Sequence, residues 1–150
     1  MIILKSKSEL ELMRIAGRIV AETLHEAEAA IRPGITTDDL DRLIDAAIRG
    51  RGAIPSFKGL YGFPASACIS VNEEIVHGIP GRRTLKAGDI VSLDVGAQHK
   101  GFHADGAWTF PVGTISPATQ RLLDVTHTAL FIGLAKVTPD GRILDISQAI

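Results

Sequence analysis

Two aspartates in the stretch SLDVGAQHKGFHADGAW, which runs from Ser92 to Trp108, have the residue type and spacing for metal or proton chemistry. Asp94 and Asp105 have ten residues between them, and each lies in a short apolar run, where an unpaired negative charge is unfavourable. Two carboxylates at close range either share a proton or hold one or two divalent cations between their oxygens. Either chemistry requires the fold to bring the two side chains together.

Both aspartates fall in segments predicted to be strands, Asp89–Val95 and Phe102–Phe110. Because side chains alternate between strand faces, each aspartate lies opposite the more apolar face of its strand. A hairpin with a two-residue turn at His99–Lys100 would place the two carboxylates directly opposite each other, with Cβ atoms about 5 Å apart. A three-residue turn would remove this opposition, and solvated loop aspartates are the simpler alternative. Two carboxylates also fall short of the three or more protein ligands typical of a catalytic metal site.

His77 is the histidine whose neighbours best suit a binding site. Gly78 and Pro80 follow it and predict a tight turn at a strand end, where a side chain can project into a cleft. There it could donate a proton to a substrate carbonyl oxygen or amide nitrogen. An ordinary exposed histidine is the alternative. His103 shares a predicted strand face with Asp105, which allows a supporting role beside a metal.

The segment Pro55–Ser70 has the composition of a loop that walls a small pocket. It is rich in glycine and interleaves aromatic residues with the chain's one cysteine, Cys68. A predicted strand, Ala67–Val71, overlaps the end of this segment. An apolar pocket and ordinary core packing are equally compatible with this composition.

Helices are predicted on either side of these strands. A capping box formed by Ser8 and Glu11 predicts the start of the first helix, and Pro33–Gly34 its end. A second helix is predicted to open near Thr36–Asp38 and to close at Gly50.

A third helix is predicted from the N-cap Ser116 to about Val137. Moving the early helices forward by 106 residues then aligns Pro33 with Pro139 and Asp39 with Asp145. The pattern predicts either an internal duplication or two separate examples of a common helix–proline–helix arrangement. With a duplication, the chain would hold one repeat and the opening of the next.

Composition indicates an ordinary globular domain. The 150 residues are 45% hydrophobic and 22% charged, with a net charge of −1, which argues against nucleic-acid binding and a polybasic membrane patch. Sparse aromatic residues argue against a base-stacking platform. A single cysteine excludes a disulfide framework and favours a reducing compartment. The first ten residues do not resemble a signal peptide, and no apolar run approaches membrane-spanning length. These features predict a cytoplasmic protein.

Three motifs in order, GFPASACISVNEEIVHGIPG, GDIVSLDVGA and GFHADGAWTFPVG, resemble the bacterial type I methionine aminopeptidases. The resemblance extends over essentially the whole chain. It implies the α/β pita-bread fold with two pseudo-symmetric halves. Residues 1–150 would form one catalytic domain, truncated at its C-terminus, with the first half and the start of the second.

The family resemblance also implies an activity and partners. Members are metal-dependent hydrolases that remove the initiator methionine from nascent proteins when the next residue is small. The implied enzyme is a cytoplasmic monomer with the ribosome as a candidate partner, and it has no specific nucleic-acid or membrane partner.

Particular residues match the family's functional positions. The resemblance implies that Asp94 chelates one metal and that Asp105 bridges two, the metals being Co, Mn, Fe or Zn. His77 would bind substrate and stabilise the transition state. The residues implied to line the methionine pocket are Phe57, Leu60, Phe63 and Cys68.

The chain departs from the family pattern in several places. The family's other metal ligands, one histidine and two glutamates, fall beyond Ile150, as does a second substrate-contacting histidine. Residues 1–150 alone are therefore expected to be inactive. Gly106 stands where many members have serine or threonine, and Leu60 and Tyr61 differ from the common pocket residues. The competing interpretations are a non-catalytic pita-bread peptide-binding module and a peptidase of the prolidase type.

Overall fold

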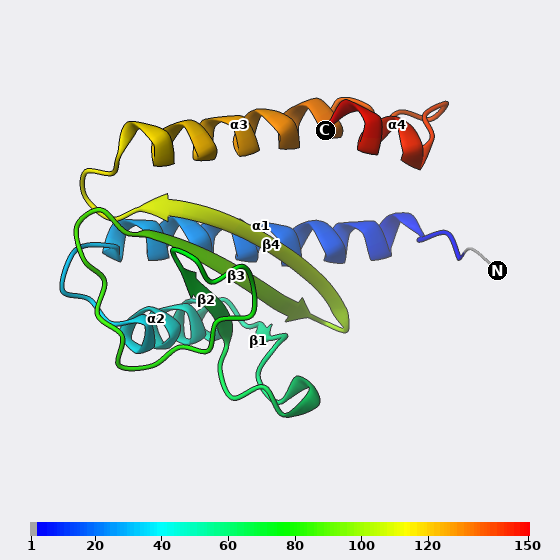
Figure 1. The fold of residues 1–150 in the computed structure, drawn as a ribbon. Helices are drawn as coiled ribbons and strands as arrows, with labels where there is room; N and C mark the ends of the chain where they lie inside the picture. The colour runs from blue at the N-terminus through cyan, green and yellow to red at the C-terminus, as the bar shows by residue number, and fades with distance from the viewer. Residues whose placement is uncertain (1–2) are drawn as a thin grey trace. The chain divides into compact units, whose positions relative to one another are not determined.

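The computed structural model describes residues 3–150 and divides the chain into two compact units (Figure 1). Unit 1 extends to Thr114 and contains two helices and a four-stranded sheet. Unit 2 spans Ile115–Ile150 and contains two helices. Both aspartates, His77 and the glycine-rich loop belong to unit 1, so the candidate site is built within it.

Helix α1 (Lys7–Ala30) begins two residues earlier than predicted. Its N-cap is Ser6, whose hydroxyl accepts a hydrogen bond from the Glu9 backbone N–H, while the Glu9 carboxylate accepts one from the Ser6 N–H. The predicted capping box of Ser8 and Glu11 is therefore wrong. Both pairs have the same S-x-x-E spacing, but the Ser8 hydroxyl bonds that of Ser6, and Glu11 pairs with Arg14.

Helix α2 (Thr37–Gly50) begins where predicted, with Thr36 as N-cap. The Thr36 hydroxyl and the Asp39 carboxylate each accept a backbone hydrogen bond from the other residue, which completes a capping box. Leu40, Ile44 and Ile48, four residues apart, are fully buried. This apolar row packs α2 into the core of unit 1.

The sheet is organised around its central strand, β3 (Ile90–His99). Strand β4 (Phe102–Pro111) pairs with β3 over its whole length. Strands β1 (Ile54–Pro55) and β2 (Ala67–Val71) therefore share the opposite edge of β3, and all pairings are antiparallel. A short 3-10 helix, η1 (Leu60–Gly62), lies in the loop between β1 and β2.

The β3–β4 turn falls one residue later than predicted. His99 pairs with Phe102, so the two central turn residues are Lys100 and Gly101, and the prediction of His99–Lys100 is wrong. Lys100 and Gly101 have φ values of 49° and 87°. Positive φ at both central positions suits the right-handed twist of a hairpin, and glycine adopts it at little cost. This requirement selects the turn with Gly101 in its second position.

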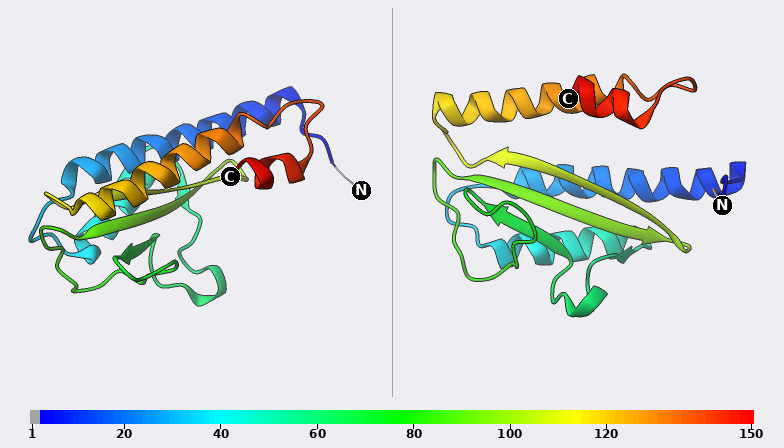
Figure 2. Two further views of the ribbon diagram at one scale, coloured as in Figure 1. Left: turned by 45° about the horizontal axis from the view of Figure 1, so that its top comes forward. Right: turned by 45° about the vertical axis from the view of Figure 1, so that its right-hand side comes forward.

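Helices α1 and α2 cover one face of the sheet, as the views in Figures 1 and 2 show. Val91, Leu93 and Val95 on β3 are fully buried and belong to the core cluster that includes residues of both helices. A Cβ added to Gly106 on β4 would lie 3.2 Å from Val20 Cγ1 on α1. The apolar strand faces therefore point toward the helices, as strand alternation predicts, and the aspartates occupy the opposite face.

Unit 2 contains α3 (Pro117–Leu134) and α4 (Ile143–Ala149). Helix α3 begins as predicted, with the Ser116 hydroxyl accepting from a backbone N–H and Pro117 in the first position. It ends at Leu134, three residues before the predicted end. A Cβ on Gly133 would lie 2.9 Å from Ile150, so glycine lets α4 pack closely on α3. No helix within residues 3–150 is long and apolar enough to cross a membrane.

Candidate metal and substrate site

Asp94 and Asp105 lie on the same face of the sheet, but they are diagonal neighbours. Asp94 is opposite Ala107, and Asp105 is opposite Gly96. The predicted direct opposition is wrong because the turn is displaced by one residue on each strand. A diagonal pair remains within interaction range, at roughly 7–8 Å between backbone positions. The shared face that the sequence predicts is confirmed.

One oxygen of the Asp94 carboxylate is left without a compensating hydrogen bond within residues 3–150. This oxygen, Oδ1, is buried and has no hydrogen-bond partner there. Burial raises the pKa of Asp94, the negative charge of Asp105 raises it further, and the charge of His77 partly opposes the rise. A buried carboxylate oxygen without a partner is costly, and a bound cation would remove that cost.

Cys68 lies beside Asp94 on the same face. The two residues are paired between β2 and β3, and Cys68 is 7% exposed. Burial raises the pKa of the Cys68 thiol to about 11, with the charges of Asp94 and Asp105 adding to the rise. The thiol therefore stays protonated at neutral pH and acts as an apolar surface rather than a thiolate ligand.

Phe57 packs on the strand that carries Asp94. A Cβ added to Gly96 would lie 2.6 Å from Phe57 Cε1 and 2.9 Å from Ser56 Cβ. Gly96 is directly opposite Asp105, so the aromatic ring lies next to the diagonal pair. Only glycine leaves room for the ring here, and this role of Gly96 was not predicted from the sequence.

The other two predicted pocket residues lie at the tip of the loop. Leu60 is 51% exposed and donates its backbone N–H to the Phe57 carbonyl. The Phe63 N–H donates in turn to the Leu60 carbonyl, and the Phe63 side chain is half-buried. These bonds form a compact turn around η1, but they place neither side chain against the aspartates. Their pocket role stays a prediction.

His77 lies in the loop between β2 and β3 and not in the predicted tight turn at a strand end, because the turn after β2 falls at Asn72–Glu73; the His77 backbone is nevertheless constrained. Its φ is 60°, in the left-handed region that non-glycine residues seldom adopt. The next residue, Gly78, packs so closely on β2 that a Cβ there would lie 2.2 Å from the Ile69 carbonyl oxygen. The charge of His77 lowers the pKa of Asp94, and the role of His77 at the site stays a prediction.

His103 has a different partner from the one considered in the sequence. It lies on the aspartate face, as predicted, but its Nδ1 is 2.9 Å from the Ser56 hydroxyl. This bond connects β4 to the start of the loop that carries Phe57. A supporting role of His103 beside a metal stays a prediction.

Residues 11–150 match the sequence model of metallopeptidase family M24. The chain belongs to this family. It is 54% identical over 150 residues to methionine aminopeptidase 1 of Bacillus subtilis (strain 168), and the match covers 100% of this chain and 60% of that relative.

Solved structures agree with this family assignment. The crystal structure of methionine aminopeptidase from Thermotoga maritima superimposes with a TM-score of 0.97 at 39% identity, covering 100% of this chain and 61% of that one. The Xaa-Pro dipeptidase from Bacillus anthracis, at 24% identity and a TM-score of 0.77 over 87% of this chain and 35% of that one, shares the fold. The predicted pita-bread fold is confirmed. This M24 chain spans about 60% of the length of the two methionine aminopeptidases named here.

The M24 chain's residues fit part of a metal centre. Asp94 and Asp105 supply carboxylate oxygens, the ligand type preferred by hard divalent cations. Within residues 3–150, no group of three or more histidine, cysteine, aspartate or glutamate side chains is placed to hold a metal. Two aspartates are fewer than the three or more protein ligands typical of a catalytic metal site.

The M24 chain also has a pocket in unit 2, but its lining is chemically poor. The pocket has a volume of about 570 Å³ and lies where α3 ends and α4 begins. Its one carboxylate, Asp145, already accepts a hydrogen bond from the Arg142 N–H. The aspartate face of unit 1 is the better candidate site because its carboxylate oxygen is unpaired.

Proposed function

We propose that this M24 chain supplies the first part of the active site of a methionine aminopeptidase. The observation that carries the proposal is the buried, unpartnered Oδ1 of Asp94 next to a second carboxylate, Asp105. Both lie in a metallopeptidase chain, and the relatives named methionine aminopeptidase are 54% and 39% identical to it.

Asp94 and Asp105 would hold divalent cations through their carboxylate oxygens. The complete site would take two ions, with Co, Mn, Fe and Zn as candidates, and Asp105 would bridge them. When bound, such ions polarise a carbonyl group and lower the pKa of water, which supplies a nucleophile near neutral pH. Two carboxylates alone hold metal weakly, so we expect residues 1–150 alone to be inactive.

The apolar side of the site would select the substrate. The protonated Cys68 thiol and the Phe57 ring flank the carboxylate pair, and a methionine side chain packs well on such a surface because it is unbranched and polarizable. Leu60 and Phe63 would complete the wall. His77, whose charge lowers the pKa of Asp94, would donate a hydrogen bond to the substrate amide group.

The substrates would be nascent polypeptides with an N-terminal methionine followed by a small residue. Such substrates would put the enzyme in the cytoplasm, with the ribosome as a candidate partner, and the complete enzyme would be a monomer with one catalytic domain. Selection by a pocket of this kind would be limited to size and shape.

A chimeric enzyme tests the proposal directly. Residues 1–150 are fused to the part of the Bacillus subtilis relative that this chain does not cover, and turnover of a Met-Gly-X peptide is measured with added Mn²⁺. We expect turnover that requires metal and falls at least about 100-fold with Asp94→Asn, because one carboxylate ligand is lost. Gln98→Glu, on the same face of β3, is the matched control and should retain activity.

Each outcome bears on the proposal. A folded chimera that binds Mn²⁺ but does not cleave the peptide would refute the aminopeptidase function. Faster cleavage of X-Pro dipeptides than of Met-Ala-X would indicate a prolidase-type peptidase. Peptide binding unaffected by chelator and by Asp94→Asn would instead favour the non-catalytic module.

A further inference from the structure

Helix α2 carries a row of polar side chains beside its buried apolar row. Thr37, Asp41 and Asp45 are spaced by four residues, so they lie along one side of the helix. Thr37 and Asp41 are buried, and Asp45 is largely shielded. We call these three residues the anchor row, because each makes hydrogen bonds to a segment distant in the sequence.

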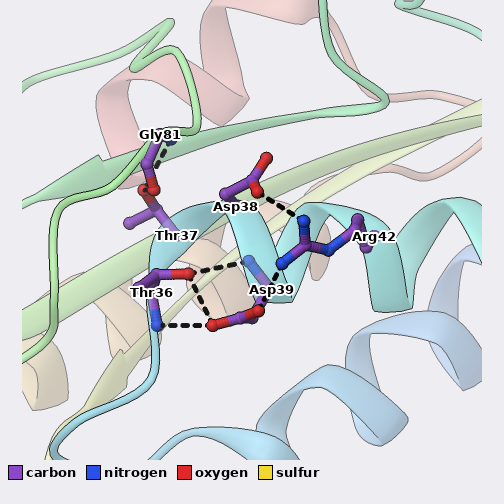
Figure 3. A network of polar contacts seen from close by, with 6 residues as sticks. All are labelled: Thr36, Thr37, Asp38, Asp39, Arg42 and Gly81. Carbon is purple, nitrogen blue, oxygen red and sulfur yellow. Dashed lines mark hydrogen bonds and ion pairs between the residues drawn. The ribbon is translucent and has the colours of Figure 1, made fainter.

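The first member, Thr37, fixes the segment that follows His77. Its hydroxyl donates to the Gly81 carbonyl at 3.0 Å and accepts from the Gly81 N–H at 2.9 Å (Figure 3). Backbone N–H groups of Thr37 and Asp38 donate to the Arg83 and Gly81 carbonyls. The N-terminus of α2 thereby holds the chain four residues after His77.

A second attachment holds the same segment to strand β2, directly after His77. The Gly78 N–H donates to the Ser70 hydroxyl, and the Gly78 carbonyl accepts from the Ile69 N–H. His77 therefore lies just before a short stretch that is fixed at both Gly78 and Gly81. These contacts keep the unfavourable positive φ of His77 in place.

The second member, Asp41, fixes the end of the loop that carries Phe57. Its Oδ1 accepts hydrogen bonds from the backbone N–H groups of Ser66 and Ala67, both at 2.9 Å. Cys68, which pairs with Asp94, is the next residue. A carboxylate that is 8% exposed is costly to bury, and these two bonds offset part of that cost.

The third member, Asp45, connects both ends of the same loop. Its Oδ1 accepts from the Ser66 hydroxyl at 2.6 Å and from Lys58 Nζ at 3.3 Å. Lys58 is adjacent to Phe57 in the chain. The other carboxylate oxygen of Asp45, Oδ2, accepts from Arg49 Nε at 2.7 Å, and this bond orients the carboxylate.

We propose that the anchor row of α2 positions the substrate side of the site through two separate attachments. Thr37 sets the place of His77, and Asp41 with Asp45 sets the place of Phe57 and Cys68. The three residues are positioning residues, since they act through the loops they hold. That these loops form the substrate side of the site rests on the proposed function. The attachments themselves do not depend on it, and they can be tested without measuring enzyme activity.

The experiment uses the 150-residue chain and two local readouts. The first is the NMR resonance of the His77 imidazole C2–H, assigned by its loss in His77→Gln. The second is the rate at which iodoacetamide alkylates Cys68, the only cysteine in the chain. Fluorescence of Trp108, the only tryptophan, checks that unit 1 is folded in each variant.

Thr37→Val removes the hydroxyl with little change of shape, and Thr37→Ser keeps it. We expect Thr37→Val to shift the His77 resonance and to leave the Cys68 alkylation rate within about twofold of the parent. Thr37→Ser should restore the parent resonance. Restoration by serine separates the hydroxyl's positioning role from a general loss of packing.

Asp41→Leu removes the acceptor, and Asp41→Asn keeps an oxygen in the same place. Because the Asp41 charge itself raises the pKa of Cys68, the informative comparison is between these two uncharged variants. We expect Cys68 to be alkylated about tenfold faster in the Asp41→Leu variant than in the Asp41→Asn variant. The His77 resonance should be unchanged in both variants.

Asp38→Leu is the matched control on the same helix, because the Asp38 side chain is 48% exposed and pairs only with Arg42 among the ion pairs of residues 3–150. It should move neither readout. If Asp41→Leu does not fold, Ser66→Ala removes one Asp45 bond and should speed alkylation about threefold. The proposal is overturned if folded Thr37 and Asp41 variants move both readouts together, or if neither readout moves.

Discussion

The helix pair of unit 1 and the helix pair of unit 2 are built from similar local signals. A shift of 106 residues places the first residue of α2, Thr37, on the first residue of α4, Ile143. The same shift places Asp39 on Asp145, and each carboxylate accepts the N–H of the residue that caps its helix. Both turns contain a proline and a glycine before the cap.

The two pairs differ in what surrounds them. Ile44 of α2 is 0% exposed, whereas its counterpart at the end of α4, Ile150, is 66% exposed. In unit 1 the helices pack against four strands, while residues 115–150 contain no strand. Helix starts and ends thus follow from neighbouring residues, but burial of a helix face depends on elements distant in the sequence.

The largest expected difference between the two helix pairs is in core stability. Ile44→Ala should lower the free energy of unfolding of unit 1 by about 2–5 kcal/mol, because it leaves a cavity in a packed core. Ile150→Ala should change it by less than about 0.5 kcal/mol. Urea unfolding followed by Trp108 fluorescence reports on unit 1 and measures both. Equal losses in the two variants would show that burial does not distinguish the pairs.

Removal of a cap should have the next largest effect. Thr36→Ala deletes the hydroxyl that accepts the Asp39 N–H, and it should cost about 1 kcal/mol in the same Trp108-monitored unfolding. Thr36→Ser keeps the hydroxyl and is the control. A Thr36→Ala variant with the parent's urea midpoint would mean that tertiary packing alone holds the start of α2.

A gain rather than a loss is expected at the corresponding position of α4. The Arg142 side chain has no acceptor group, so α4 has only the Asp145 half of the box. Arg142→Thr should complete it and stabilise α4 locally by about 0.5 kcal/mol, seen as stronger helical circular dichroism at 222 nm. The Trp108 midpoint should not change. Unchanged helicity would show that α4 is limited by packing instead.

Much of the fold could be predicted from the sequence because its signals are local. The cap at Thr36, the Ser116–Pro117 start and the three main strands all follow from residues within a few positions of each element. The first cap was misplaced because Ser6 and Ser8 both satisfy the same spacing. The choice between Ser6 and Ser8 as N-cap depends on the hydrogen bonds that each side chain forms in the folded protein.

The candidate site was harder to predict because it depends on register and on distant contacts. Strand alternation correctly predicts that Asp94 and Asp105 share one face, but the turn lies one residue later than predicted, because its second position has a positive φ that favours Gly101. The bonds of Asp41 span 25 and 26 residues, and no local pattern indicates them. The roles of the aspartates as metal ligands stay predictions.

The smallest expected effect concerns the pH dependence of the two capping carboxylates. In unit 1, the pKa of Asp39 is lowered to about 2, chiefly by the Thr36 hydroxyl and then by Arg42. A lowered folded-state pKa stabilises the protein above the carboxyl's ordinary pKa of about 3.9, and this contribution is lost as the pH falls toward 2. Asp39→Asn should therefore lower the Trp108 urea midpoint at pH 7, and the difference from the parent should shrink between pH 4 and pH 2.

Asp145→Asn is the matched variant in unit 2, and it should leave the Trp108 midpoint unchanged at every pH. Because Asp39 is exposed, 0.5 M salt should reduce the effect of Asp39→Asn at pH 7. A difference between Asp39→Asn and the parent that stays constant from pH 7 to pH 2 would contradict the electrostatic explanation. It would mean that the Asp39 side chain supports the cap equally well with or without its charge, and that the two carboxylates differ only in the packing around their helices.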